Sequence, residues 1–363
     1  MAPYPCCSHG WHCILPPYLL EALRDAAGEQ AGRSAVYQLP LWLEPTRRQS
    51  DLLRHLRMGF DPSMVSAFPG ITASTGSATK SREIYDAQNR GIAGLPGRLV
   101  RREGSGPSAD RSVDEAYDHS GITHDFFSQR FMRNSLDDRG LTLISSVHVG
   151  QSLNNAFWTG QQMAYGDGDG KLFTRFTRSL DVVAHELTHG VVSYTANLVY
   201  ENESGALNEH FADVFGMLTR QWHERTAAKN ADWLVGRDIM GPQATARGLR
   251  TFKAEKAYDN DPWFGTDPQP KHLKDQYRGN ADNGGVHINS GIPNHAFYRF
   301  AVALGGNAWE RAGGVWYEAL LSLPQEAQFT DMVLATEKTA VEQHGFNSAL
   351  HHTLMRAWAD TGF

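Results

Sequence analysis

The sequence predicts an α+β fold with a β-rich N-terminal lobe and a helical C-terminal lobe. Between residues 83 and 178, short segments of alternating polarity are separated by Gly, Asp, Asn and Pro, as in strands joined by turns. From Ser179 onward, apolar residues recur mainly at helical spacing. Residues 68–80 lack periodicity and are rich in Gly, Ser, Thr and Ala, which indicates an exposed linker. We therefore expect a prosegment and linker over residues 1–70, a β-rich lobe over 71–190 and a helical lobe over 191–363.

The individual elements follow from local patterns. Before the linker, we expect helices over residues 19–27 and 50–58. In the β-rich lobe, alternation predicts strands at 83–85, 141–149 and 156–158, and a longer pattern predicts a helix over 113–131. In the helical lobe, amphipathic patterns predict helices over 330–343 and 347–358.

Length and composition limit the function. A chain of 363 residues is long enough for two domains and an extra segment, and 41% hydrophobic residues can form sizeable cores. The formal net charge is −6 and the basic runs are short, so no basic patch of the kind that binds nucleic acid is expected. No apolar run approaches the ~20 residues of a membrane span. We expect neither nucleic acid nor a membrane as a partner.

The first thirteen residues are unusual in two ways. They lack the basic and apolar regions of a secretory signal, so the chain stays inside, leaves by an unusual route, or has lost a leader. They also hold all three cysteines, Cys6, Cys7 and Cys13, with His9 and His12 between them. A small zinc site and a disordered terminus are both open interpretations of this Cys/His-rich tract.

The segment His185-Glu186-Leu187-Thr188-His189 matches H-E-x-x-H, a pattern that carries a mechanism when it lies on a helix. Residues four apart on a helix point the same way, so both histidines can reach one metal ion. Glu186 lies beside them, close enough to polarise a metal-bound water. The alternative is an accidental match, with the histidines as ordinary core residues.

A third metal ligand is expected on a neighbouring element, because a catalytic zinc takes three protein ligands and keeps one open position. Glu209 lies twenty residues after His189, which leaves room for a turn and a second helix that packs back. Asp213 is four residues further on, on the same face, where it can accept a hydrogen bond from a liganding histidine. The residues that follow are apolar, so these carboxylates are expected to be buried and to need a partner.

These motifs resemble the thermolysin family of zinc metallopeptidases. H-E-L-T-H at 185–189 and N-E-S-G-A-L-N-E-x-x-x-D at 202–213 are similar to its metal-binding segments. N-N-A-F-W at 154–158, M-A-Y-G-D-G-D-G at 163–170 and D-N-G-G-V-H-I-N-S-G at 282–291 also resemble it. The resemblance covers about residues 83 to 363 and implies a two-lobed metalloprotease with the zinc helix at the cleft between the lobes.

The resemblance also implies a mechanism and its residues. Zinc held by His185, His189 and Glu209 activates a water, and Glu186 acts as general base. Tyr200 and His287 are expected to stabilise the oxyanion, with Asp282 orienting His287. Taken alone, the tyrosine could be a core aromatic and His287 a structural histidine.

Substrate binding is inferred from the same resemblance. Asn155 and the backbone of Ala156 are similar to an edge strand that holds an extended peptide, and Arg250 to an arginine that binds a substrate carbonyl. The pocket for the residue after the cut is expected to be apolar and to favour Leu, Phe or Ile, although its members could equally be core residues: Phe173, Phe176, Val182, Val235 and Leu249. We expect a monomeric endopeptidase that acts on peptide and protein substrates.

The N-terminal segment C-I-L-P-P-Y-L-L at 13–20 resembles the prosegment motif of the protealysin-like branch of the family, which has a short propeptide. The resemblance implies an intramolecular inhibitor that caps the active site, and Cys13 is a candidate to reach the zinc. Processing is expected between about residues 60 and 80. Secretion is implied by the resemblance, although no signal peptide is evident.

One departure from the family pattern concerns calcium. Larger relatives carry a paired calcium site beside the zinc helix; here Asp181 and Asp232 remain, but Arg220, Leu234 and Arg237 occupy other expected acidic positions. Calcium needs six to eight oxygen ligands. We therefore predict that the double site is absent and that the arginines pair with the remaining aspartates. The acidic loop at 167–170 is either a calcium loop or a tight turn at the cleft rim.

Two other functions share this metal architecture. A zinc aminopeptidase would need an acidic group for the free α-amine, and no segment of the type G-x-M-E-N is present. A latent or non-catalytic zinc-binding interaction protein would not need Glu186, Tyr200 and His287. Both alternatives are therefore weaker than the endopeptidase.

Overall fold

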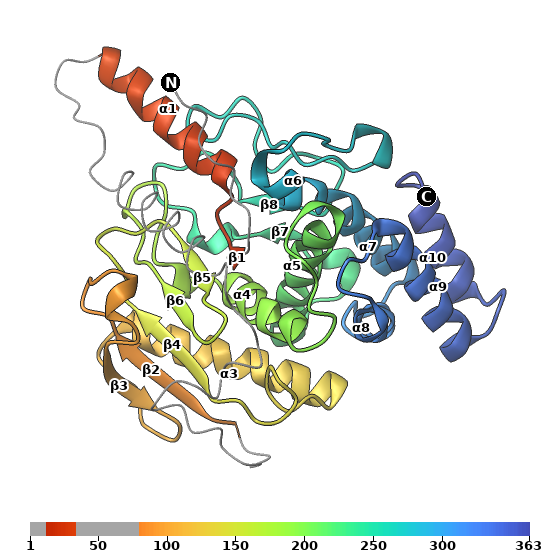
Figure 1. Cartoon of the computed structure of the whole chain (residues 1–363), viewed down its shortest axis with the longest axis horizontal. Helices are drawn as coiled ribbons and strands as arrows, with labels where there is room; N and C mark the ends of the chain where they lie inside the picture. Colours follow the sequence, from red (N-terminus) through yellow and green to blue (C-terminus); the bar gives the residue numbers. More distant parts are fainter. Residues whose placement is uncertain (1–11, 34–79) are drawn as a thin grey trace.

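The computed structural model describes residues 12–33 and 80–363 of the chain. The β-rich lobe, the central pair of helices and the helical lobe follow one another along the sequence (Figure 1). The expected helix at 50–58, the linker, the processing region and the first two cysteines lie outside the described residues. No helix in the described parts of the chain is long and apolar enough to cross a membrane.

The N-terminal lobe is built on a mixed six-stranded sheet in the order β1-β5-β6-β4-β2-β3. Its strands are β1 (His12–Cys13), β2 (Arg82–Asp86), β3 (Arg98–Arg102), β4 (Leu143–Val147), β5 (Ala156–Trp158) and β6 (Met163–Tyr165). The three strands expected in this lobe are therefore confirmed. The structure adds β1, which comes from the far N-terminus and pairs antiparallel with β5 at the edge of the sheet.

Helix α3 (Arg111–Phe131) packs against this sheet, as the sequence pattern predicts. The side chain of Asp110 caps the helix by accepting hydrogen bonds from the backbone N–H groups of Ser112 and Val113. Such a cap satisfies two of the N–H groups that the first turn of a helix leaves unpaired.

The C-terminal lobe is mainly helical, in agreement with the prediction. Helix α4 (Leu180–Ser193) ends the N-terminal lobe. The helices of the C-terminal lobe are α5 (Asn202–Glu224), α6 (Ala281–Asn289), α7 (Gly291–Leu304), α8 (Arg311–Ser322), α9 (Phe329–His344) and α10 (Ala349–Ala359). The expected helices at 330–343 and 347–358 correspond to α9 and α10. Between α5 and α6, the chain forms 3-10 turns and the short pair β7 (Leu234–Val235) and β8 (Arg250–Thr251). This stretch is interrupted by Gly, Pro and Asp, which favour turns.

Helices α4 and α5 form the centre of the molecule and carry the metal-binding motif (Figure 1). Their close approach depends on Gly216, because a Cβ there would lie 2.7 Å from the Asp181 carbonyl oxygen and 3.1 Å from the His185 nitrogen. The sequence leaves room for a turn before this second helix, α5. The helix begins at Asn202, and Gly205 lies inside its first turns, where a Cβ would meet Val286 at 2.4 Å.

The N-terminal segment docks on this body. After β1, the chain forms α1 (Pro17–Arg33), which contacts α6 (Figure 1). Its buried apolar side chains belong to the main hydrophobic core: Leu19, Leu20, Leu23 and Ala27. The expected helix at 19–27 is therefore part of a longer one. The prosegment thus contacts the sheet of the first lobe through β1 and the second lobe through α1.

Candidate metal centre and active site

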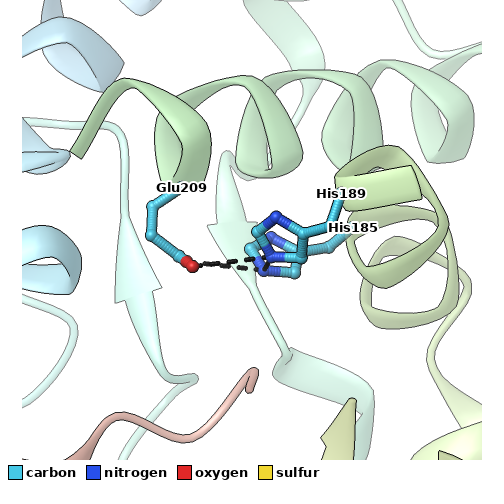
Figure 2. Close-up of side chains that lie close together, drawn as sticks. All are labelled: His185, His189 and Glu209. Atoms are coloured by element: carbon cyan, nitrogen blue, oxygen red, sulfur yellow. Dashed lines mark hydrogen bonds and ion pairs between the residues drawn. The ribbon is translucent and has the colours of Figure 1, made fainter. Parts of the chain in front are cut away.

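Two histidines from α4 and a glutamate from α5 converge on one point. The ligand atoms of His185, His189 and Glu209 all lie within 4.8 Å of one another, and the three side chains are buried. Each histidine presents Nε2, which lies 3.5 Å from a Glu209 carboxylate oxygen, and the two Nε2 atoms are 3.1 Å apart (Figure 2). The i,i+4 spacing on α4 therefore aims both rings at the carboxylate that α5 supplies.

The opposite ring nitrogens have their own partners. Nδ1 of His185 lies 2.9 Å from an Asp213 carboxylate oxygen, and Nδ1 of His189 lies 2.9 Å from Oδ1 of Asn208. Because these oxygens accept, each Nδ1 carries the proton and each Nε2 keeps its lone pair for a metal. Asp213 was expected in this position. The sequence reasoning missed Asn208, although it directly precedes the expected ligand Glu209.

The charge balance of the centre also calls for a cation. Glu186, Glu209 and Asp213 are each no more than 1% exposed, and buried carboxylates need positive partners. Arg250 supplies one, through Nη2 at 2.8 Å and Nε at 2.9 Å from Asp213. Burial alone raises the pKa of Asp213, but Arg250 and His185 outweigh it and hold that pKa well below its usual range. These groups carry three negative charges on carboxylates and one positive charge on a guanidinium. A divalent metal ion between the histidines would therefore balance the charge of the site.

The expected general base has a fixed orientation. Glu186 Oε2 accepts a hydrogen bond of 2.9 Å from the backbone N–H of Trp158, the last residue of β5. Ala156, the first residue of the same strand, and Asn155, which directly precedes it, are the expected peptide-binding groups. The strand therefore positions the base and the peptide-binding edge together, a link that the sequence reasoning missed.

The expected oxyanion donors, Tyr200 and His287, lie next to the metal-binding residue Glu209. Tyr200 donates a hydrogen bond to Glu209, and its hydroxyl lies 3.2 Å from Nε2 of His287. Nδ1 of His287 lies 2.6 Å from Asp282, whose second carboxylate oxygen accepts from the His287 backbone N–H. Burial lowers the pKa of His287, but Glu209 and Asp282 outweigh it and hold this pKa above its ordinary value. The imidazole is thereby kept as a donor.

The N-terminal segment contacts two of these groups through its main chain. The carbonyl oxygen of Cys13 lies 3.1 Å from Nε2 of His287, and the carbonyl oxygen of Ile14 accepts from Nη1 of Arg250 at 3.2 Å. Cys13 was a candidate to reach the zinc through its sulfur. Its sulfur does not belong to the one group of metal-ligating side chains found among the described residues. The thiol side instead packs in a small apolar cluster that includes Phe157.

The five expected pocket residues are all buried in the main core, together with Ile14: Phe173, Phe176, Val182, Val235 and Leu249. The rings of Phe173 and Phe176 pack with their centroids 5.8 Å apart. The structure thus brings the pocket residues into one apolar region, in which the first residue after Cys13 is also buried.

Arg220 and Arg237 pair with the aspartates near them, as the sequence predicts. Nη2 of Arg220 lies 3.7 Å from Asp232 and 3.5 Å from Asp238, and Arg237 also pairs with Asp232. Asp181 accepts from the backbone N–H of Gly236 at 2.7 Å. Burial lowers the pKa of Arg220, but these aspartates outweigh it and raise the pKa above its usual value.

The acidic loop at 167–170 forms a tight turn. Oδ1 of Asp169 accepts from the backbone N–H groups of Lys171, Leu172 and Phe173, and Gly168 and Gly170 adopt positive φ angles of 72° and 70°. This carboxylate oxygen therefore organises the turn that leads into the pocket.

Comparison with known proteins agrees with this geometry. The model of the thermolysin metallopeptidase catalytic domain matches residues 73–193, and that of the thermolysin metallopeptidase α-helical domain matches residues 196–363. The chain belongs to the thermolysin family of metallopeptidases. It is a peptide hydrolase and, like its family, a zinc-dependent metalloendopeptidase; the fold predicted from the sequence is confirmed.

Individual relatives cover the N-terminal segment as well. The chain is 47% identical to an extracellular metalloprotease of Pectobacterium carotovorum subsp. carotovorum, over 100% of this chain and 98% of that protein. It is 41% identical to the protease PrtS of Photorhabdus sp. (strain Az29), over 96% and 91% of the two chains. The precursor of protealysin, a metalloproteinase from Serratia proteamaculans, superposes with a TM-score of 0.81 at 42% identity, over 97% of this chain and 99% of that one.

Proposed function

We propose that His185, His189 and Glu209 hold the zinc and that Glu186 is the general base of peptide hydrolysis. The single observation that carries this proposal is the convergence of three buried ligand atoms within 4.8 Å, with both histidine Nδ1 atoms occupied by acceptors. Zinc bound there would supply Lewis acidity, which lowers the pKa of a water toward neutrality and polarises the peptide carbonyl.

The remaining steps belong to the protein's own side chains. Glu186 takes the proton of the attacking water and delivers it to the leaving amine. His287 and Tyr200 donate hydrogen bonds to the carbonyl oxygen as negative charge develops on it. Asp282 accepts from Nδ1 of His287 at 2.6 Å and so aims the opposite nitrogen at that oxygen.

We propose a preference for cleavage on the N-terminal side of hydrophobic residues. The expected peptide-binding groups are Asn155, Ala156 and Arg250. They form hydrogen bonds with the main chain of residues 14–15, next to the catalytic residues. The apolar pocket around Phe173 and Leu249 would receive the side chain that follows the cut, and a Leu, Phe or Ile side chain satisfies its chemistry. The substrates are peptides and proteins, and the enzyme acts as a monomer.

The N-terminal segment is proposed as an intramolecular inhibitor that is removed by processing between about residues 60 and 80. Support comes from its position, because Cys13 and Ile14 contact His287 and Arg250 directly. The organisation into a prosegment and linker (1–70), a β-rich lobe (71–190) and a helical lobe (191–363) fits this role. Secretion is proposed because a close relative is an extracellular metalloprotease.

We further propose that the paired calcium site is absent. Guanidinium groups of Arg220 and Arg237 lie among the aspartates that would otherwise ligate the ions. The aminopeptidase and the non-catalytic binding protein are not favoured, since family membership and the complete set of catalytic groups point to an endopeptidase.

The test compares the intact mass of the purified wild-type chain with that of Glu186→Gln over time in the presence of zinc. We expect the wild type to lose its N-terminal region while the variant stays whole and binds zinc equally well. General base catalysis contributes about 10²–10⁴-fold, so cleavage of an added peptide with Leu after the cut should fall by about that factor. Equal processing of both proteins would remove Glu186 from the mechanism.

A further inference from the structure

The main chain of residues 13–15 lies on the catalytic groups in the manner of a bound peptide. β1 runs antiparallel to β5, with Cys13 opposite Phe157. The N–H of Ile14 donates to the carbonyl oxygen of Ala156 at 3.3 Å, and the N–H of Leu15 donates to Oδ1 of Asn155 at 3.2 Å. The prosegment therefore uses the backbone edge that the proposed function assigns to the substrate.

The two carbonyl groups complete this register. The Cys13 carbonyl oxygen lies 3.1 Å from Nε2 of His287, and the Ile14 carbonyl oxygen lies 3.2 Å from Nη1 of Arg250. Both ring nitrogens of His287 then face acceptor oxygens, Nδ1 that of Asp282 and Nε2 that of Cys13. The carbonyl presented to the expected oxyanion donors is that of Cys13, and the peptide bond that follows it joins Cys13 to Ile14.

The sequence excludes the two neighbouring registers on the C-terminal side. If the segment were shifted along β5 so that Pro16 took the place of Leu15, Pro16 would face Asn155. It could donate no hydrogen bond there, because proline has no N–H. If the shift were two residues, Pro16 would take the place of Ile14. It would then face the carbonyl oxygen of Ala156 and again could donate no hydrogen bond. The present register also buries the side chains of Ile14 and Leu15 completely.

We propose that the Cys13–Ile14 bond is a self-cleavage site of this chain. The proposal rests on the proposed function, since it uses the same catalytic groups on a bond within the chain. One water is consumed: its hydroxyl adds to the carbonyl carbon of Cys13, the C–N bond breaks, and the nitrogen of Ile14 takes the proton. The products are a peptide that ends in the Cys13 carboxylate and a chain that begins with the Ile14 amine.

Cleavage at this bond does not by itself open the active site. On the C-terminal side, Ile14 and Leu15 stay bonded to Ala156, Asn155 and Arg250, and α1 holds the main core through its leucines. The new end of the chain therefore remains in the cleft after the cut. This cleavage is a nick that precedes activation and is distinct from processing in the linker.

The experiment follows the full-length chain with zinc by intact mass, at several protein concentrations. We expect a species comprising residues 14–363 and a peptide of residues 1–13, formed at a first-order rate that does not change with concentration. Glu186→Gln should show neither. Two substitutions at the bond serve as a matched pair. Ile14→Pro removes the backbone N–H of residue 14 and should abolish the cleavage. Ile14→Val retains this N–H and should slow the cleavage by about tenfold or less.

A second readout tests the register without any turnover. In zinc-free full-length Glu186→Gln, hydrogen exchange at the amides of Ile14 and Leu15 should be slow, because both donate to β5. Exchange at the rate of a free peptide would overturn the register. If these amides are protected but no species beginning at Ile14 forms, the self-cleavage is overturned. If, in addition, the protein cleaves an added peptide after its N-terminal region is removed by trypsin, the proposed function survives the loss of this proposal.

Discussion

Asp213 contacts an expected metal ligand and, at the same time, accepts hydrogen bonds from an expected substrate-binding residue. One of its oxygens faces Nδ1 of His185, and both oxygens face the guanidinium of Arg250. The amide of Asn294 adds a further bond of 2.8 Å. A single buried carboxylate therefore sets the tautomer of the metal ligand and the position of the arginine.

We predict that Asp213→Asn weakens zinc binding by about 10–100-fold, because an amide cannot serve all these donors and leaves one of them unpaired. The dissociation constant for zinc, measured by competition with a chelator, checks this. Asp118→Asn on the exposed face of α3 is the matched control and should leave zinc affinity unchanged. Equal affinities for Asp213→Asn and the wild type would show that Asp213 does not support the metal site.

At the scale of elements, the distance between α4 and α5 sets the geometry of the metal centre. Gly216 permits this distance, since a Cβ would press on the backbone of Asp181 and His185 at 2.7 and 3.1 Å. Gly314 in α8 offers a comparison, because a Cβ there would meet nothing within 4 Å.

We predict that Gly216→Ala destabilises the protein by about 1–3 kcal/mol through overpacking and lowers its zinc content. Gly314→Ala should instead stabilise it by about 0.5–1 kcal/mol, because alanine restricts the unfolded chain and its Cβ meets nothing at this helical position. Denaturant unfolding together with metal analysis distinguishes the two effects. If both substitutions stabilise the protein, the contact between α4 and α5 is looser than described.

A second link between elements joins the cap of α3 to the loop after β6. Nε2 of His148 lies 2.8 Å from Asp110, and Nδ1 lies 2.7 Å from Asp167. The hydrogen bond to Asp167 raises the pKa of His148, and the bond to Asp110 adds to this effect. Partial burial lowers the pKa, but the two aspartates outweigh it and bring it to about 9. Arg175 is the other charged group near these carboxylates. Both ring nitrogens thus donate, and the folded state favours the imidazolium.

This link predicts a pH-dependent part of the stability. The pKa of His148 rises from about 6.5 in the unfolded chain to about 9 in the folded protein. Its contribution to the free energy of unfolding is therefore complete below pH 6.5 and is lost as the pH rises toward 9. The melting temperature of His148→Gln should therefore differ most from that of the wild type near pH 6 and converge with it above pH 9. His352→Gln, an exposed histidine on α10, is the control and should show no such convergence. A constant difference across this range would contradict the prediction.

For the whole molecule, the sequence predicted what depends on local spacing. The pair His185 and His189 follows from helical geometry, and Glu209 with Asp213 follows from one face of a second helix. The strands and long amphipathic helices were predicted for the same reason. These features need no knowledge of how distant segments meet.

The sequence did not predict what depends on distant segments. The bond from the Trp158 backbone to Glu186 and the bond from Asn294 to Asp213 join residues 28 and 81 positions apart. β1 pairs with a strand more than a hundred residues away, so its two residues carry no strand pattern of their own. The sequence analysis named no individual elements between α5 and α6, where Gly, Pro and Asp favour turns over a periodic pattern.

The charge arrangement around Arg220 leads us to expect that the protein does not respond to calcium. Asp181, Asp232 and Asp238 gather near this guanidinium, whose side chain is only 4% exposed. The positive charge occupies the region in which larger relatives are expected to hold ions. Calcium would have to displace it and still find six to eight oxygen ligands.

We predict that millimolar calcium leaves the melting temperature of the zinc-loaded protein unchanged. Arg220→Gln should lower stability by about 1–3 kcal/mol, less than the ~3–5 kcal/mol of a fully buried pair, because its aspartate partners are about a third exposed. Calorimetry with and without calcium measures both effects. A rise of many degrees in the wild type would show that calcium binds despite the arginines. A calcium response that appears only in Arg220→Gln would instead show that the guanidinium takes the place of the ion.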